Sequence, residues 1–399
     1  MNLVPLRDRP ARHPGNTGER DRIRPGPSNP RMRVTRGLLV AGLVLAGPAV
    51  LRLSAADRKS SEQVAAEIQR IEQTGKKPAP SDPAMAGVAS AAQSALKSAG
   101  EALQSERLYL ALERLAQAVD LFGGLDELAA TAAAPPSDIA AFEVEWGKTS
   151  RELAALSRQV QSRDPGRLPA AVRALSEAAL GRSVPLLDGG RGFAVATGPK
   201  DGLFYLGEAR GEAKFADFCG SLAASRKRSG WGARSLLPEL LALQAKADEA
   251  FQPPRSIEQH SRFIALNSTI KLARELDSTK SYYGALYQYL ESLRHYALLD
   301  APPVDAARQA ELKSAVAAEL ARFAASSRDD SIPQLFLERA ASQTVHPDGS
   351  APSADEWRSA QAILTQVLPA YAAAMKAPAP LRQTGGKTVD VTLVRWPYT

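Results

Sequence analysis

Apolar residues recur at every third or fourth position along most of the chain from residue 60 to residue 376. This spacing places them on one face of a helix, so it predicts a series of amphipathic α-helices. The clearest stripe runs through Ile139, Phe142, Trp146, Thr149 and Leu153, with the heptad spacing of a packed core. We expect helices over residues 60–74, 84–104, 105–122, 139–160, 168–180, 201–222, 236–251, 256–277, 278–299, 312–323, 332–341 and 355–376.

Glycine and β-branched residues break this helical pattern in a few places. Residues 184–202 are rich in glycine, which predicts a loop with a short strand at about 190–197, and Gly123-Gly124 predicts the end of a helix. Residues 389–394 read as a strand, which needs a partner such as the 190–197 segment or another chain. The expected fold class is all-α: a multi-helix bundle or irregular helical array, with one N-terminal membrane helix and this minor β element.

A short pattern occurs twice in the helical region. Leu108-Tyr109-x-x-Leu112-Glu113-x-Leu115 matches Leu286-Tyr287-x-x-Leu290-Glu291-x-Leu293, and Lys97-x-Ala99-x-Glu101 has an echo in Lys271-x-Ala273-x-Glu275. A duplicated helical hairpin would produce both matches. Leucine, alanine and glutamate are so frequent in this chain that coincidence is the better explanation.

An uncharged apolar run from Gly37 to Leu51 lies between Arg36 and Arg52. Fifteen helical residues span about 22 Å, which is short for a bilayer core of about 30 Å, but arginines at both ends can extend their head groups outward. We interpret residues 37–53 as a transmembrane signal-anchor. A cleaved signal peptide and a buried core helix are the alternatives, and small residues at Gly47-Pro48-Ala49 and Ser54-Ala55-Ala56 offer cleavage sites.

The charge of the chain is concentrated before this run. Residues 1–36 hold nine arginines against three acidic residues, a net +6, while the whole chain is +7. A body of about neutral charge argues against a nucleic-acid-binding domain. The Pro-rich tail is predicted to be disordered, cytoplasmic and in contact with an anionic membrane surface. We expect an inner-membrane, single-pass protein with its body in the periplasm.

The chain therefore divides into five parts. A disordered basic tail (1–36) precedes the signal-anchor (37–53), and a short helix with a Pro-rich spacer (54–82) leads to the helical body (83–376). A linker with the C-terminal strand (377–399) closes the sequence.

The residues that carry common site chemistry are few and scattered. Four histidines lie far apart and Cys219 is the single cysteine, so no metal site, disulfide or cofactor is expected. Phe215 and Phe218 flank Cys219, which is typical of a buried, unreactive thiol. The glycines of 188–202 fit neither nucleotide-binding pattern. No catalytic residue can be assigned from these patterns.

Aromatic and basic residues supply the candidate partner-binding side chains. Tyr283 and Tyr287 fall beside the main apolar stripe of their helix, which fits either core packing or a binding groove. A basic turn with a tryptophan and the C-terminal strand provide further contacts. The candidate residues are Tyr283, Tyr287, Arg226, Lys227, Arg228, Trp231 and Trp396.

These observations favour a membrane-anchored, extracytoplasmic helical interaction or scaffold protein that binds a protein or cell-envelope partner. One alternative is an exported hydrolase with its site where the 188–202 loop faces the basic 226–234 turn. Its test is whether Asp188, Arg191, Lys200 and Asp201 converge in a pocket with Glu208 or His260. A second alternative is a soluble periplasmic binding protein released from a cleaved signal peptide.

Overall fold

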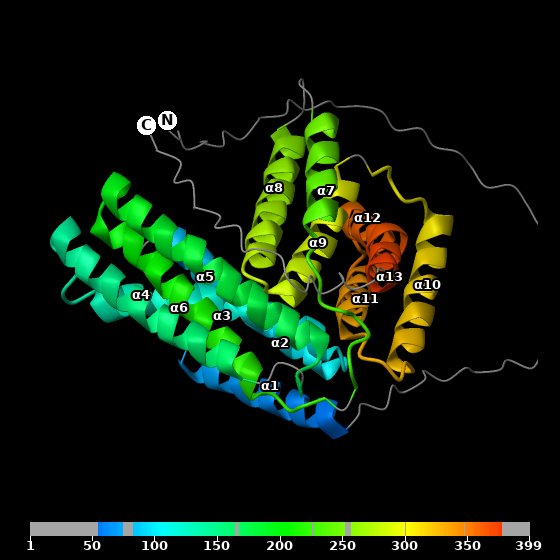
Figure 1. Ribbon diagram of the computed structural model, residues 1–399, viewed down its shortest axis with the longest axis horizontal. Helices are drawn as coiled ribbons and strands as arrows, with labels where there is room; N and C mark the ends of the chain where they lie inside the picture. The colour runs from blue at the N-terminus through cyan, green and yellow to red at the C-terminus, as the bar shows by residue number, and fades with distance from the viewer. Residues whose placement is uncertain are drawn as a thin grey trace, which may run out of the picture. The chain divides into compact units, whose positions relative to one another are not determined.

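The computed structural model describes residues 55–74, 83–163, 167–225, 227–251, 257–299, 301–346 and 348–376 (Figure 1). Every regular element within these ranges is helical, which confirms the predicted all-α class. In chain order the elements are α1 (Ala55–Thr74), α2 (Pro83–Gln104), α3 (Leu108–Thr131), α4 (Ile139–Ser162), α5 (Ala170–Thr197), α6 (Pro199–Ser221), α7 (Leu237–Ala250), α8 (Ile257–Ser278), α9 (Tyr282–Ala297), α10 (Ala306–Ala324), α11 (Ser331–Thr344), α12 (Ala354–Ala362), a π-helical turn (Ile363–Val367) and α13 (Leu368–Lys376).

Helices α3, α5 and α6 form the centre of the helical body. Helix α6 packs against both α3 and α5, while α2 lies on α3 and α4 lies on α5 and α6 (Figure 1). Helix α5 also contacts α9, which forms a hairpin with α8. One apolar core runs through these helices, and it includes Leu112, Leu175, Phe215, Leu286 and Phe336. The pattern of apolar residues therefore reported the core correctly.

Helix α1 belongs to this core. Val64, Ile68 and Ile71 of α1 are buried in it, and α1 contacts both α2 and α3. We predicted this segment as part of the spacer, but its apolar stripe packs against helices of the body.

Glycines let the central helices approach one another closely. A Cβ atom at Gly207 of α6 would lie 2.3 Å from the carbonyl oxygen of Gly123 in α3, and one at Gly211 would lie 2.6 Å from that of Val119. Helix α3 therefore continues through Gly123-Gly124 to Thr131, so the predicted helix end at these glycines is wrong. The two glycines serve as a contact face for α6.

The Gly-rich segment 184–202 is also helical, so the predicted loop and the strand at about 190–197 are wrong. Helix α5 continues through Pro185 to Thr197, and α6 begins at Pro199 after the single left-handed residue Gly198 (φ 128°). A Cβ atom at Gly190 would lie 2.9 Å from the carbonyl oxygen of Gly202. Packing between two helix backbones thus outweighs the low helix propensity of glycine. The predicted strand at 389–394 lies outside the described residues.

The α2–α3 and α8–α9 hairpins have the same connection. Glu106 (φ 58°) and Lys280 (φ 62°) are both left-handed. The amide of the next residue closes each turn, from Arg107 to the carbonyl of Ala102 and from Ser281 to that of Leu276, at 2.9 Å in both cases. Lys97–Glu101 and Lys271–Glu275 occupy matching positions and form ion pairs of 3.6 and 3.9 Å. The turns and ion pairs lie 174 residues apart (106 and 280, 97 and 271), whereas the Leu-Tyr-x-x-Leu-Glu patterns lie 178 apart (108 and 286), so the two matches do not share one register.

Within the part of the chain that the structure describes, we find no helix that combines the length and the apolar character of a bilayer span. The apolar run at 37–51, the tail before it and residues 377–399 all lie outside the described ranges.

Candidate functional site

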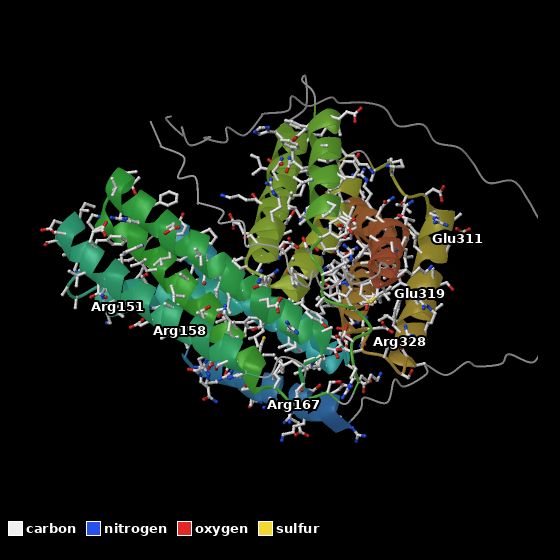
Figure 2. All side chains as sticks on the ribbon, viewed as in Figure 1. Arg151, Arg158, Arg167, Glu311, Glu319 and Arg328 are labelled. Atoms are coloured by element: carbon white, nitrogen blue, oxygen red, sulfur yellow. The ribbon has the colours of Figure 1, made fainter. Side chains whose placement is uncertain are left out.

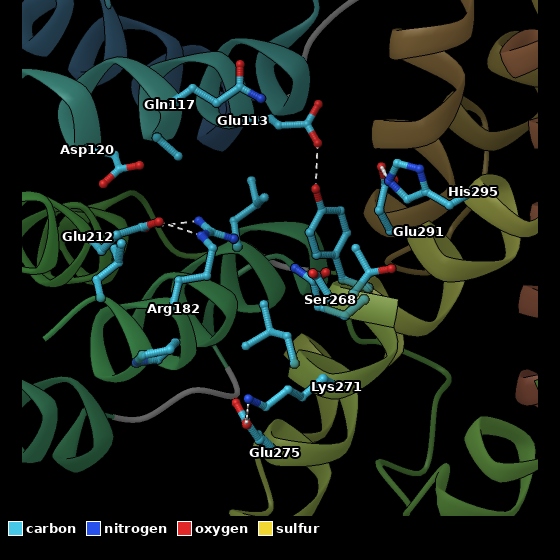
Figure 3. A pocket seen from close by; sticks show the side chains of 18 of the residues that line it. Glu113, Gln117, Asp120, Arg182, Glu212, Ser268, Lys271, Glu275, Glu291 and His295 are labelled. Carbon is cyan, nitrogen blue, oxygen red and sulfur yellow. Dashed lines mark hydrogen bonds and ion pairs between the residues drawn. The ribbon is translucent and has the colours of Figure 1, made fainter. Parts of the chain in front are cut away.

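A pocket of about 900 Å³ opens between α3, α5, α6, α8, α9 and α11 (Figure 3). Its walls are unusually rich in charged and amide side chains for a site at the centre of a helical body. The polar lining residues are Glu113, Arg114, Gln117, Asp120, Arg182, Glu212, Ser268, Thr269, Lys271, Glu275, Gln288, Glu291, Arg294, His295, Arg339 and Gln343.

One wall is organised by Arg339 of α11. Its guanidinium group donates to Glu113 of α3, and it also donates to Oε2 of Glu291 in α9 at 2.6 Å. The hydroxyl of Tyr287 donates to Oε1 of Glu113 at 2.6 Å (Figure 3). Glu291 also accepts from Arg294, so each buried charge of this wall has an opposite charge within hydrogen-bond distance.

The electrostatics of this cluster follow from burial and from these pairs. Burial alone would raise the pKa of Glu291, but the guanidinium groups of Arg294 and Arg339 outweigh it and hold that pKa well below its usual range. Burial lowers the pKa of Arg339, whereas Glu113 and Glu291 raise it further, so it stays charged. The cluster therefore ties α3, α9 and α11 together as a fixed ionic wall.

The opposite wall combines an ion pair with an unpaired carboxyl group. Arg182 of α5 donates two hydrogen bonds to Glu212 of α6, one of them at 2.9 Å to Oε2 (Figure 3). Asp120 of α3 faces this pair, and its Oδ1 atom is buried without a hydrogen-bond partner among the described residues. Burial, with the nearby charges of Glu212 and Glu208, raises the pKa of Asp120 to about 8. At neutral pH this carboxyl group is mostly protonated.

These buried carboxyl groups predict that the protein loses stability as the pH rises. Asp120, Glu208 and Glu338 have folded-state pKa values of about 8, 7 and 7, above the ordinary values of 3.8 and 4.5. Between these limits the folded state holds protons that the unfolded state has released, so the free energy of unfolding falls with rising pH. Glu291 acts in the opposite direction because its pKa is lowered, but its stabilisation is fully present above its ordinary pKa of 4.5 and therefore hardly changes between pH 5 and pH 8.

We therefore expect the free energy of unfolding to be at least about 3 kcal/mol larger at pH 5 than at pH 8. Urea titrations followed by far-UV circular dichroism measure this difference. The Asp120→Asn variant removes one of the titrating groups and should reduce it. Equal stability at the two pH values would contradict the protonation states described above.

The candidate partner-binding residues do not form one surface. Tyr283 and Tyr287 are buried, 8% and 6% exposed, and Trp231 packs edge-on against Tyr283 with 5.0 Å between ring centroids. Of these, Tyr287 reaches the pocket, where it binds Glu113. The side chains of Lys227 and Arg228 are exposed. Arg226 and Trp396 lie outside the described residues.

The residues proposed for a hydrolytic site stay apart. Asp188 and Arg191 of α5, with Lys200 and Asp201 of α6, are all exposed. Glu208 is buried, and His260 lies on α8 beside Phe251, with 5.7 Å between ring centroids. Because residues 188–202 are helical, no loop faces the basic turn, and this particular site is not formed.

The charged residues of the pocket were missed by the sequence analysis. Glu113 and Glu291 were noted only as part of the repeated Leu-Tyr-x-x-Leu-Glu pattern, yet both bind Arg339. Glu338 and Arg339 stand between the apolar residues 335–337 and Ala340-Ala341, and charges inside such a stretch are a signal of burial that calls for a partner. Asp120 carried no comparable signal.

The described residues contain no cluster of three or more potential metal ligands. Cys219 is buried, and burial raises the pKa of its thiol, so it is a poor nucleophile. Comparisons of the chain with protein-family models, with curated proteins and with solved structures found no match.

Proposed function

We propose that this protein is a membrane-anchored, extracytoplasmic binding protein whose helical body holds a component of the cell envelope in the central pocket. The pocket carries the proposal: about 900 Å³ lined by charged side chains from six helices is a volume typical of small-molecule sites. The apolar run at 37–51 and the basic tail support the membrane location and the orientation of the body.

The ion pairs in the pocket walls favour ligand binding because they hold the lining side chains in place. Arg339 holds Glu113 and Glu291, and Arg182 holds Glu212, so these side chains keep their positions before a ligand arrives. Polar groups that are already fixed cost little to order on binding. The pocket also draws its walls from helices far apart in the chain, so an occupant would stabilise the whole body.

Photo-cross-linking tests the pocket as the binding site. A benzoylphenylalanine at Gln117, an exposed residue of the lining, should form adducts in intact cells, whereas one at Arg151, on the solvent side of α4, should not (Figure 2). Mass spectrometry would identify the adducts.

Two glycines of α5 provide a matched pair for this test. A Cβ atom at Gly189 or at Gly192 meets nothing within 4 Å, and of the two only Gly189 lines the pocket. Gly189→Trp should fill the pocket and abolish the Gln117 adducts, and Gly192→Trp should leave them unchanged. Adducts that survive Gly189→Trp would count against the pocket.

Protease digestion of spheroplasts tests the anchor and its orientation. A C-terminally tagged full-length chain should remain in the membrane fraction and be destroyed by external protease. A shorter, soluble, exported band would instead support the cleaved, periplasmic binding protein. A band protected from protease would contradict an extracytoplasmic body.

One observation favours the exported hydrolase as a second candidate. Asp120 remains protonated at neutral pH beside the carboxylate of Glu212, and a protonated acid next to a carboxylate is a common catalytic arrangement. This version of the hydrolase uses the pocket and none of the four residues Asp188, Arg191, Lys200 and Asp201. Loss of an envelope-hydrolysing activity in the Asp120→Asn variant would support it.

A further inference from the structure

Two side-chain oxygen atoms in the pocket lining have no hydrogen-bond partner among the described residues. Oδ1 of Asp120 and Oε1 of Gln343 are both buried, and neither has a partner among the described residues. Both residues line the same pocket, on α3 and α11. Unpaired buried polar atoms are costly, so these two oxygen atoms offer hydrogen-bonding positions to an occupant of the cavity that supplies N–H groups.

We propose that the pocket binds a small cationic ligand and holds its ammonium or guanidinium group between Asp120 and the Arg182–Glu212 pair. This inference rests on the proposed function of the pocket as a binding site, and it names the chemistry of the occupant.

The charges around Asp120 support a cation. Helix α6 contributes Glu208 and Glu212, and α5 contributes Arg182, which is engaged by both carboxylate oxygens of Glu212. On α3 itself, Arg114 donates to the side chain of Gln117 at 3.2 Å. Three acidic side chains therefore lie near one committed guanidinium group, and a ligand cation would balance the charge of Asp120 in its ionised form.

The opposite wall does not favour an anion. The guanidinium groups of Arg294 and Arg339 already bind Glu291, and Arg339 also binds Glu113. An anionic ligand would have to displace these carboxylates from buried ion pairs, which is costly. A neutral ligand could bind the two unpartnered oxygen atoms, but it would not stabilise the ionised form of Asp120.

Cation binding should also release a proton. Ionisation of Asp120 is opposed by burial and by Glu212 and Glu208, and a bound ammonium group would offset all three. The carboxyl group would then pass its proton to the solvent as the cation binds. Affinity for a cation should therefore increase as the pH rises through the neutral range.

Three probes of equal carbon chain length test the charge preference. Isothermal titration of the full-length protein in detergent would compare putrescine with 1,4-butanediol and with succinate, and agmatine would provide the guanidinium group. We expect putrescine or agmatine to bind, with heats that differ between two buffers of unlike ionisation enthalpy because a proton is released. The neutral and anionic probes should bind at least tenfold more weakly.

Asp120→Asn keeps the shape of the side chain and removes its charge, so it should weaken binding of the cation at least tenfold and abolish the proton release. Asp188→Asn, on the exposed face of α5, is the matched control and should bind as the wild type does. Because the wild-type carboxyl group is unpaired, Asp120→Asn should unfold at or above the wild-type temperature, which separates lost binding from lost structure.

Equal binding by wild type and Asp120→Asn, or tighter binding of succinate than of putrescine, would overturn the inference. If neither cationic probe binds while Gly189→Trp still abolishes the Gln117 adducts, the pocket remains a binding site and the cationic ligand is wrong. If the adducts also survive Gly189→Trp, the proposed function fails as well.

Discussion

Replacing Arg339 by methionine is expected to lower the free energy of unfolding by about 3–5 kcal/mol. The side chain of Arg339 is 7% exposed, and it is a shared counter-ion of Glu113 and Glu291. Methionine keeps much of the volume but leaves two buried carboxylates without this charge. Chemical denaturation followed by circular dichroism at neutral pH measures the loss.

The surface pair Arg308–Glu311 supplies the control for this experiment. Its atoms approach to 2.8 Å, yet both side chains are about half exposed, so Arg308→Met should cost less than about 1 kcal/mol. Adding Glu113→Gln to Arg339→Met should recover part of the stability, because a neutral amide replaces the carboxylate that has lost its counter-ion, whereas Glu291 keeps Arg294. A cost for Arg339→Met no larger than that of Arg308→Met would show that the buried cluster contributes little.

Replacing Gly207 by alanine is expected to lower the free energy of unfolding by about 2–3 kcal/mol. Its Cβ atom would lie 2.3 Å from the carbonyl oxygen of Gly123, and this obstacle is backbone that no side-chain rotation can move away. Helices α3 and α6 would have to separate, and the apolar residues between them would lose contact. The midpoint of urea unfolding provides the measurement.

Gly192→Ala is the matched control, and the expected effect has the opposite sign. Gly192 lies in α5, and a Cβ atom there meets nothing within 4 Å. Alanine is the better helix former, so stability should rise by up to about 1 kcal/mol. If both substitutions changed stability by the same amount, helix propensity and not close packing would explain the glycines of this fold.

Much of the fold could be predicted because the spacing of apolar residues within a short stretch of chain indicates a helix. The apolar stripe through Leu108, Leu112 and Leu115 lies in α3, and each of these residues is buried. The prediction failed at Gly123-Gly124 and at 184–202, where glycine has two opposite meanings. Where no other helix packs against it, a glycine tends to end its helix. Where another backbone lies against it, the same residue allows the two helices to pack closely. Only the position of the neighbouring helix separates these cases.

The sequence predicted only a small part of the candidate site. Tyr287 was singled out because aromatic residues often lie at interfaces, and it does line the pocket, but as a buried partner of Glu113. Asp120 occupies an ordinary helical position in the sequence. Its raised pKa depends on burial and on Glu212 and Glu208, which another helix brings close to it.

The sequence by itself determined the helical class, most helix positions, and the separation of a basic tail and an apolar run from a nearly neutral body. These properties depend on residue spacing and composition over short stretches of chain. Only the tertiary structure decided which glycines are contact points, which charges are paired and where the pocket lies. Arg339 and Glu113 meet across 226 positions, and no local pattern encodes which distant helix supplies a buried charge with its partner.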